Sequence, residues 1–158
     1  MVVDVLTEIT VARPIATVAA YAADPDNAPT WYENIESVRW KTDPPLRVGS
    51  EFEFVAHFLG RSLKYTYQVR EFVPEERLVM RTSEGPFPME TTYTWRVVNA
   101  TSTRMTLGNR GGATGPLARL LGPLEAFAVR RATRKDLARL RSILENDLRE
   151  SRRGASGT

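Results

Sequence analysis

Residues 50–73 read SEFEFVAHFLGRSLKYTYQVREFV, and this stretch decides the fold. Apolar and polar side chains alternate on both sides of Gly60-Arg61, and such a period of two is typical of a β-strand with one buried face. A short glycine-containing connection between two such segments predicts an antiparallel hairpin, because a parallel pair needs a crossover of a dozen residues or more. We therefore predict strands over 50–58 and 62–73.

The same pattern continues on both sides of this hairpin. Turn-rich separators, including Asp43-Pro44-Pro45 and Asn99-Ala100-Thr101, bound further alternating segments. The predicted strands cover 3–11, 35–42, 77–83, 89–98 and 102–109. Because all connections from residue 35 onward are short, we expect a six-stranded antiparallel meander preceded by the strand at 3–11.

Helices are predicted at both ends of this strand region. A first helix begins near Pro14 and ends at Asp24-Pro25, and a short helix or helical turn over 25–33 ends with Trp31 and Tyr32. A long helix is predicted from Pro123, after a short turn over 116–121. Its apolar stripe recurs at steps of three and four: Ala126, Val129, Thr133, Leu137, Leu140 and Leu144.

The opposite face of the long helix is basic. It carries Arg130, Arg131, Arg134, Lys135, Arg139 and Arg141, with Asp136 and Glu145 interleaved among them. Interleaved acidic residues favour a solvated helix face over a docking surface. We predict one α+β domain over 1–150, with residues 151–158 as a loose polar tail.

Composition excludes several chemistries. The 158 residues include no cysteine and one histidine, His57, which excludes disulfides, thiol nucleophiles, Cys-containing zinc sites and mechanisms that need two histidines. We expect no metal and no cofactor. No apolar run reaches the ~18 residues of a membrane span, and the N-terminus lacks the order of a signal peptide, so a cytoplasmic location is expected.

Several motifs in a fixed order resemble the START-like helix-grip (SRPBCC) superfamily, and within it the polyketide cyclase/dehydrase-like group. The matching residues are Ala12-Arg13-Pro14, Val18, Asp24, Trp31, Val48-Gly49-Ser50, Gly60-Arg61, Val69, Pro74, Arg77-Leu78 and the long terminal helix. The resemblance covers residues 3–148. It implies a curved seven-stranded antiparallel sheet wrapped around a long C-terminal helix, with an elongated cavity between them. Members bind lipids, sterols, quinones, plant hormones or polyketides, and some are cyclases, aromatases or dehydratases. We expect the protein to be bacterial.

Strand alternation predicts which side chains face that cavity. The predicted ligand-binding residues are Phe54, Phe58, Tyr65, Tyr67, Met89, Tyr93, Trp95, Leu107 and Asn109 from the strands, with Leu124 and Phe127 from the helix. Aromatic rings with polar tips suit a flat or aromatic ligand. The alternative is that these aromatics only fill the core, as we expect for Trp31.

Catalytic residues are harder to identify. Tyr65, Tyr67, Tyr93 and Arg110 are the candidate donors for polarising a carbonyl. Parity predicts that His57 and Glu90 face outward, so the sequence offers no evident inward base. The glycine-rich segment 110–116 is either a lid over the cavity or a simple connector, and it lacks the signature of a phosphate loop.

Three functions stay open at this level. The first is binding of a small hydrophobic, aromatic, lipid-like or polyketide-like molecule in the cavity. The second is a polyketide cyclase, aromatase or dehydratase that uses cavity Tyr and Arg residues. The third is an interaction module that docks through the basic helix, for which lipid is a candidate partner and nucleic acid is not expected. A monomer and a homodimer are both compatible with the sequence.

Overall fold

The computed structural model describes residues 3–58, 60–85, 88–111 and 116–156, and the side chains of residues 3, 58 and 116–126 lie outside this description. One seven-stranded antiparallel sheet contains all the described strands, in the order β1-β7-β6-β5-β4-β3-β2. The strands are β1 (Val3–Val11), β2 (Ile35–Trp40), β3 (Glu51–Phe58), β4 (Arg61–Val73), β5 (Arg77–Glu84), β6 (Met89–Asn99) and β7 (Ser102–Gly111). The predicted meander is therefore confirmed, with strand ends within two residues of the predicted ones.

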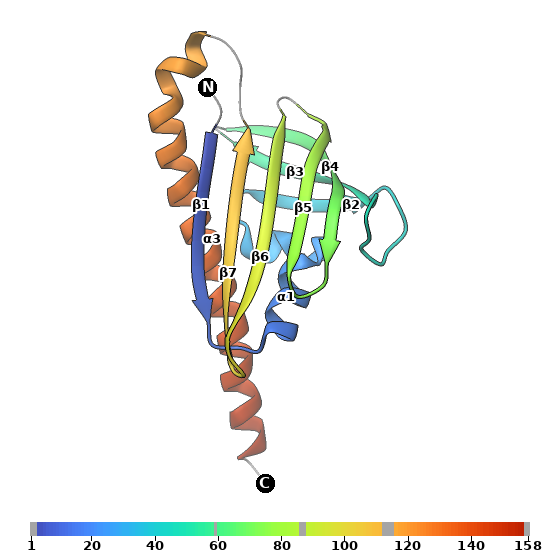
Figure 1. Ribbon diagram of the computed structural model, residues 1–158, viewed down its shortest axis with the longest axis vertical. Helices are drawn as coiled ribbons and strands as arrows, with labels where there is room; N and C mark the ends of the chain where they lie inside the picture. Colours follow the sequence, from blue (N-terminus) through green and yellow to red (C-terminus); the bar gives the residue numbers. More distant parts are fainter. Residues whose placement is uncertain (1–2, 59, 86–87, 112–115, 157–158) are drawn as a thin grey trace.

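The first strand of the chain, β1, lies at one edge of the sheet beside the last strand, β7. β1 pairs with β7 over its whole length, from Val3 opposite Gly111 to Val11 opposite Thr103. The sheet is strongly curved, so that β2, β3 and β4 cross behind β5, β6 and β7 (Figure 1). Register shifts between β4 and β5, at Thr66/Tyr67 and Val69/Glu71, accompany this curvature, because bulges bend a strand and increase its twist.

Three helical segments follow β1 and cover the concave face at one end. They are α1 (Ile15–Ala23), the single-turn η1 (Pro25–Asn27) and α2 (Ala28–Trp31), as predicted. The Asp24 carboxylate accepts a hydrogen bond from the Asp26 N–H at 3.0 Å, which ends one helix and begins the next. Trp31 is fully buried in the core, in agreement with the packing role expected for it.

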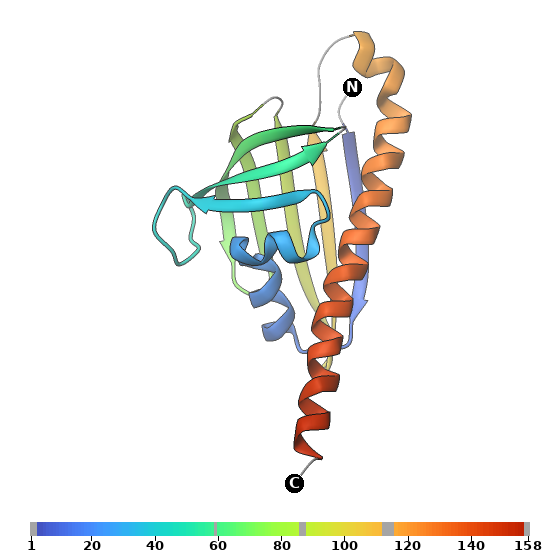
Figure 2. The same cartoon turned by 180° about the vertical axis from the view of Figure 1, so that it is seen from behind.

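The last helix, α3 (Pro116–Ala155), lies on the same concave side and runs along β1 (Figure 2). The prediction that it begins at Pro123 was wrong, because it already begins at Pro116. Pro123 removes only one N–H from the helix ladder, and the Leu, Ala and Arg residues on either side are strong helix formers. The tail predicted from Ser151 is also helical as far as Ala155, as a continuation of α3 that includes the strong helix formers Arg152 and Arg153.

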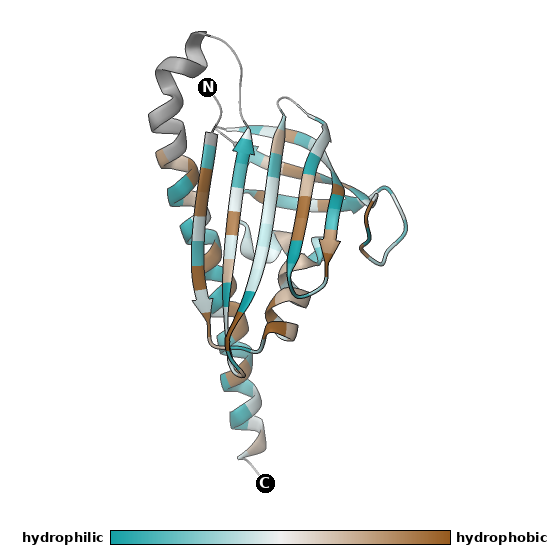
Figure 3. Cartoon of the chain, in the orientation of Figure 1, coloured by the Kyte–Doolittle hydropathy of each residue, from teal (hydrophilic) through white to brown (hydrophobic). Residues whose placement is uncertain are grey.

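The core lies between α3, the short helices and the concave face. Leu137, Leu140 and Leu144 of α3 are buried and pack into one cluster with Val11, Val18, Trp31, Phe52 and Met105. Polar and apolar residues alternate along the strands, and the end of α3 beyond the sheet is mainly hydrophilic (Figure 3). This arrangement matches the fold implied by the helix-grip resemblance.

Leu140 is expected to be a main anchor of α3, because its side chain is fully buried. Leu140→Ala is expected to lower the free energy of unfolding by about 3 kcal/mol, since truncation removes apolar contacts and leaves a cavity. Ser142→Ala, at an exposed position of the same helix, is the control and should change it by less than about 0.5 kcal/mol. Urea unfolding measures both values, and equal effects would show that α3 is not held by this contact.

Candidate functional site

The inner face of the sheet carries a chain of hydrogen-bonded polar side chains. Alternation along β4, β6 and β7 directs Tyr67, Thr91 and Asn109 to this face. The Tyr67 hydroxyl lies 3.0 Å from the Thr91 hydroxyl, which donates to Asn109 Oδ1 at 3.1 Å. Because the single Thr91 proton is used by Asn109, the Tyr67 O–H must be the donor to Thr91.

Because the hydrogen bonds run from Tyr67 to Thr91 to Asn109, the Asn109 amide N–H groups lie at the end of this hydrogen-bond chain. Asn109 is half-buried, whereas Tyr67 and Thr91 are buried. No described residue accepts a hydrogen bond from the Asn109 amide nitrogen, whereas the buried side-chain donors without a partner in that part of the structure are Trp31 Nε1 and Trp95 Nε1. A carbonyl oxygen of a ligand is the kind of acceptor that these two N–H groups would bind.

A pair of hydrogen-bonded tyrosines lies beside the hydrogen-bond chain of Tyr67, Thr91 and Asn109. Tyr32, which follows α2, and Tyr93 of β6 share a hydrogen bond between their hydroxyl groups. One of the two protons makes this bond, so the other remains for a further acceptor. The rings of Trp31 and Tyr93 pack against each other, with centroids 5.8 Å apart.

Asp136 of α3 brings a carboxylate to these tyrosines. The residue is only 5% exposed, and its Oδ1 accepts the Glu33 N–H at 3.1 Å. Burial, the largest cause, raises the pKa of Asp136 from 3.8 to about 6, and the charge of Glu33 adds to this. The Asp136 charge in turn raises the pKa of Tyr32 and Tyr93. The site therefore contains a carboxyl group that titrates near neutral pH.

Sequence reasoning missed Asp136 and placed it on the basic face. The signal was present, because Asp136 follows Thr133 by three residues and precedes Leu140 by four, which are the steps of the buried stripe. The polar identity of the residue outweighed its position. The sequence-based expectation that no carboxylate points inward was therefore wrong.

The tyrosines of the site are hydrogen-bond donors at neutral pH. Burial raises the pKa of Tyr67 to about 12, and it raises the pKa values of Tyr32, Tyr65 and Tyr93 further. Their hydroxyl groups accordingly stay protonated. Asp136 alone among these groups changes charge in the physiological range.

The predicted ligand-binding residues other than Phe127 divide into three groups. Phe54, Tyr67, Tyr93, Trp95 and Leu107 are buried, whereas Tyr65, Met89 and Asn109 are half-buried. The accessible part of the inner face is therefore the Tyr65–Met89–Asn109 end. The side chains of Phe58 and Leu124 lie outside the described part of the structure, as does the segment 112–115 of the predicted lid.

A close backbone approach supports the half-buried Tyr65. Gly85 has a φ of +155°, and a Cβ built on it would lie 2.9 Å from the Tyr65 Cβ. No other residue fits that space without displacing the Tyr65 side chain. This glycine therefore allows the backbone just after β5 to approach Tyr65 closely.

Two site predictions were wrong. Phe127 is 63% exposed, because it precedes Arg130, Arg131 and Arg134 by three, four and seven residues and so shares their outer face. Arg110 is exposed on the outer face of β7 and lies 4.0 Å from the Asp4 carboxylate. It follows the inward Asn109 by one residue, so it points away from the tyrosines.

His57 faces outward, as the alternation of side chains along β3 predicted. Its Nε2 lies 2.8 Å from Glu36 Oε2, and both side chains are more than half exposed. This pair lies on the outer face of the sheet, away from the site. Glu90 pairs with Arg81 on the same outer face.

A cavity of about 540 Å³ opens elsewhere, and Trp95 lines it. Its other walls come from Ala19 and Ala23 of α1, Trp40 and Pro44 beside β2, and Phe72 of β4. Its lining within the described residues includes none from α3. Trp95 thus belongs to this α1 cavity, whereas Tyr67, Tyr93 and Asn109 do not line it.

Metal-binding clusters and membrane-spanning helices are both missing from the described part of the chain. Over the described ranges, no three histidine, aspartate or glutamate side chains gather as a metal site would require. No helix in that part of the chain is both long enough and apolar enough to cross a membrane.

Comparison with known proteins identifies related sequences and folds. A family model described as polyketide cyclase / dehydrase and lipid transport matches residues 2–145. The Zhui aromatase/cyclase from Streptomyces sp. R1128 has a similar structure, with a TM-score of 0.78, 19% identity and full coverage of both chains. TTHA0849 from Thermus thermophilus has a TM-score of 0.77 and 20% identity over 91% of this chain and 98% of that one.

A third similar structure is a di-domain protein. The aromatase/cyclase StfQ of the steffimycin biosynthetic pathway has a TM-score of 0.76 and 11% identity, over 94% of this chain and 52% of that one. At these identities the likeness is one of fold. No curated protein matches the sequence.

Proposed function

The chain belongs to the polyketide cyclase/dehydrase and lipid-transport family, and on this premise we propose that it binds a small hydrophobic or aromatic, lipid-like or polyketide-like molecule between the concave sheet and α3. The observation that carries the proposal is the polar chain Tyr67–Thr91–Asn109, which ends in amide donors that no described residue accepts, at the half-buried end of the inner face. At such a position a ligand oxygen can replace water as the acceptor of these donors.

The chemistry of the site favours a flat ligand that carries carbonyl or phenolic oxygens. Tyr65 and Met89 offer apolar surface, and the Asn109 amide offers two donors. Tyr32 and Tyr93 together leave one further hydroxyl proton for an acceptor. A saturated fatty acid has acceptors only in its one terminal carboxylate, and its hydrocarbon chain offers none to these donors.

Binding of three probes tests the proposal. A hydroxylated anthraquinone is expected to bind about tenfold more tightly than anthracene, which lacks oxygens, and more tightly than a saturated fatty acid. Asn109→Leu should remove most of the difference between the first two, whereas His57→Asn on the outer face should not. Fluorescence titration measures the affinities. No saturable binding of any probe, or an unchanged preference in Asn109→Leu, would contradict the proposal.

A second candidate function is cyclisation or dehydration of a poly-ketone, and Asp136 is the observation that favours it. With a pKa of about 6, its carboxylate would remove a proton from a methylene group between two carbonyls. The resulting enolate would attack another carbonyl to form a C–C bond, and the oxygen of that carbonyl would take back the proton to become a hydroxyl. The carboxylate would then remove the second methylene proton, and the hydroxyl, protonated as it departs, would leave as water with formation of a C=C bond. Tyr93 and the Asn109 amide would polarise the attacked carbonyl.

Asp136→Asn tests this candidate, because asparagine keeps the shape and the acceptor for Glu33 but removes the base. Turnover of a synthetic poly-ketone thioester, followed by the loss of water in mass spectra, is expected to fall by about a hundredfold or more. Anthraquinone affinity should change by less than about threefold. Equal turnover in Asp136→Asn and wild type would leave ligand binding as the function.

A further inference from the structure

The outer face of α3 carries an uninterrupted set of basic side chains. Arg130, Arg131, Arg134, Lys135, Arg139 and Arg141 are all exposed. None of them forms a salt bridge with another described residue. From Arg130 to Arg141 these side chains span about 16 Å along the helix axis. We call this set the basic face.

The two acidic residues expected to interrupt the basic face both accept backbone hydrogen bonds from outside it. Asp136 is buried and accepts the Glu33 N–H. Glu145 accepts the Ala12 N–H at 2.9 Å, beside Arg13, whose guanidinium donates to the Leu144 carbonyl at 2.7 Å. Neither carboxylate forms a salt bridge with a described residue of the basic face.

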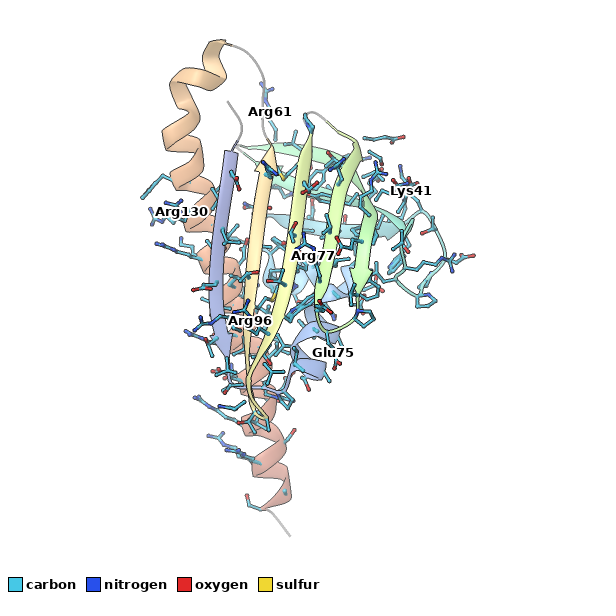
Figure 4. All side chains as sticks on the ribbon, viewed as in Figure 1. Lys41, Arg61, Glu75, Arg77, Arg96 and Arg130 are labelled. Atoms are coloured by element: carbon cyan, nitrogen blue, oxygen red, sulfur yellow. The ribbon has the colours of Figure 1, made fainter. Side chains whose placement is uncertain are left out.

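The basic face includes one large apolar side chain. Phe127 is 63% exposed and precedes Arg130 and Arg131 by three and four residues, so it lies on the same side of the helix. Figure 4 shows the Arg130 side chain pointing outward from α3, away from the sheet, whereas Arg96 lies over the sheet itself. The face is therefore accessible along its length.

We propose that the basic face of α3 binds an anionic phospholipid surface, with Phe127 entering the headgroup region. A row of cations attracts such a surface, and an aromatic residue beside the cations adds apolar burial. Nucleic acid fits less well, because residues 127–142 contain no asparagine or glutamine to read base edges and only one aromatic residue for stacking. The helix lies on the surface and does not cross it.

Vesicle binding of matched charge variants tests the proposal. The face variant Arg131→Gln/Arg134→Gln/Lys135→Gln and the control variant Arg70→Gln/Arg96→Gln/Arg104→Gln each remove three positive charges from exposed positions. At about fivefold for each cation, the face variant should bind phosphatidylglycerol vesicles about a hundredfold more weakly than wild type. The control variant should lose less than about fivefold. Co-sedimentation measures binding, and circular dichroism checks the fold of each variant.

Three further conditions sharpen the test. Binding should weaken strongly between about 50 mM and about 500 mM salt and be absent from pure phosphatidylcholine vesicles. Phe127→Ser should weaken it about fivefold without changing the salt dependence. Equal losses in the face and control variants, no binding of wild type at low salt, or no effect of Phe127→Ser would overturn the proposal. So would tighter binding to a short DNA duplex than to the vesicles at the same salt.

Discussion

Asp136→Asn is expected to raise the free energy of unfolding near neutral pH by about 1 to 2 kcal/mol and to remove part of its pH dependence. The pKa of Asp136 in the folded protein is about 6, above its ordinary value of 3.8. Between these values the folded state binds more protons than the unfolded state, so stability falls as the pH rises through this window. The two-unit difference corresponds to about 3 kcal/mol, and burial of the new amide group offsets part of that gain.

Urea unfolding at several pH values measures this effect. The difference between Asp136→Asn and wild type should grow from about pH 4 to about pH 6 and then stay level. Asp147→Asn, at an exposed position of the same helix, is the control and should give only a small difference from wild type. A constant difference for Asp136→Asn across the range would mean that this carboxyl group does not titrate as the geometry implies.

Thr91→Val is expected to lower the free energy of unfolding by about 3 kcal/mol, although valine has the shape of threonine. The substitution removes the acceptor of the Tyr67 O–H and the donor to Asn109 Oδ1 at a buried position. Each group that is left without a partner inside the protein costs about 1 to 3 kcal/mol. Thr92→Val, on the opposite face of β6, is the matched control and should have little effect.

A double-mutant cycle isolates the hydrogen-bond chain from simple packing. Tyr67→Phe alone removes one hydroxyl. In that background Thr91→Val no longer leaves a tyrosine hydroxyl without an acceptor. The two substitutions together should therefore cost less than their sum, by about 1 kcal/mol. Additive effects would show that the chain does not act as a unit. Stability of Thr91→Val equal to that of Thr92→Val would contradict the hydrogen-bond geometry.

Most of the fold follows from local patterns in the sequence. Short turns between alternating segments predicted the meander from β2 to β7, because neighbouring antiparallel strands are specified locally. The pairing of β1 with β7 joins residues about a hundred positions apart, so no local pattern indicates it. The start of α3 was misjudged because proline was given more weight than the helix formers around it.

The candidate site was predictable where the period of a strand decides orientation. Parity placed Tyr67, Tyr93 and Asn109 inward and His57 outward, as found. The prediction failed on α3, because Asp136 and Phe127 were assigned by residue type instead of by their position around the helix. A buried carboxylate and an exposed phenylalanine break the usual relation between polarity and burial, so residue type misplaced both.

Native mass spectrometry of the protein purified from its own host tests the central claim most directly, when it is followed by extraction and identification of the released compound. We predict a defined hydrophobic or aromatic adduct, which is lost in Asn109→Trp, where the larger side chain fills the accessible end of the site. Leu6→Trp, on the exposed outer face of β1, should keep the adduct. The bare mass of the chain in wild type, together with no stabilisation by sterols, quinones, fatty acids or aromatic polyketides, would mean that the inner face is a filled core and not a binding site.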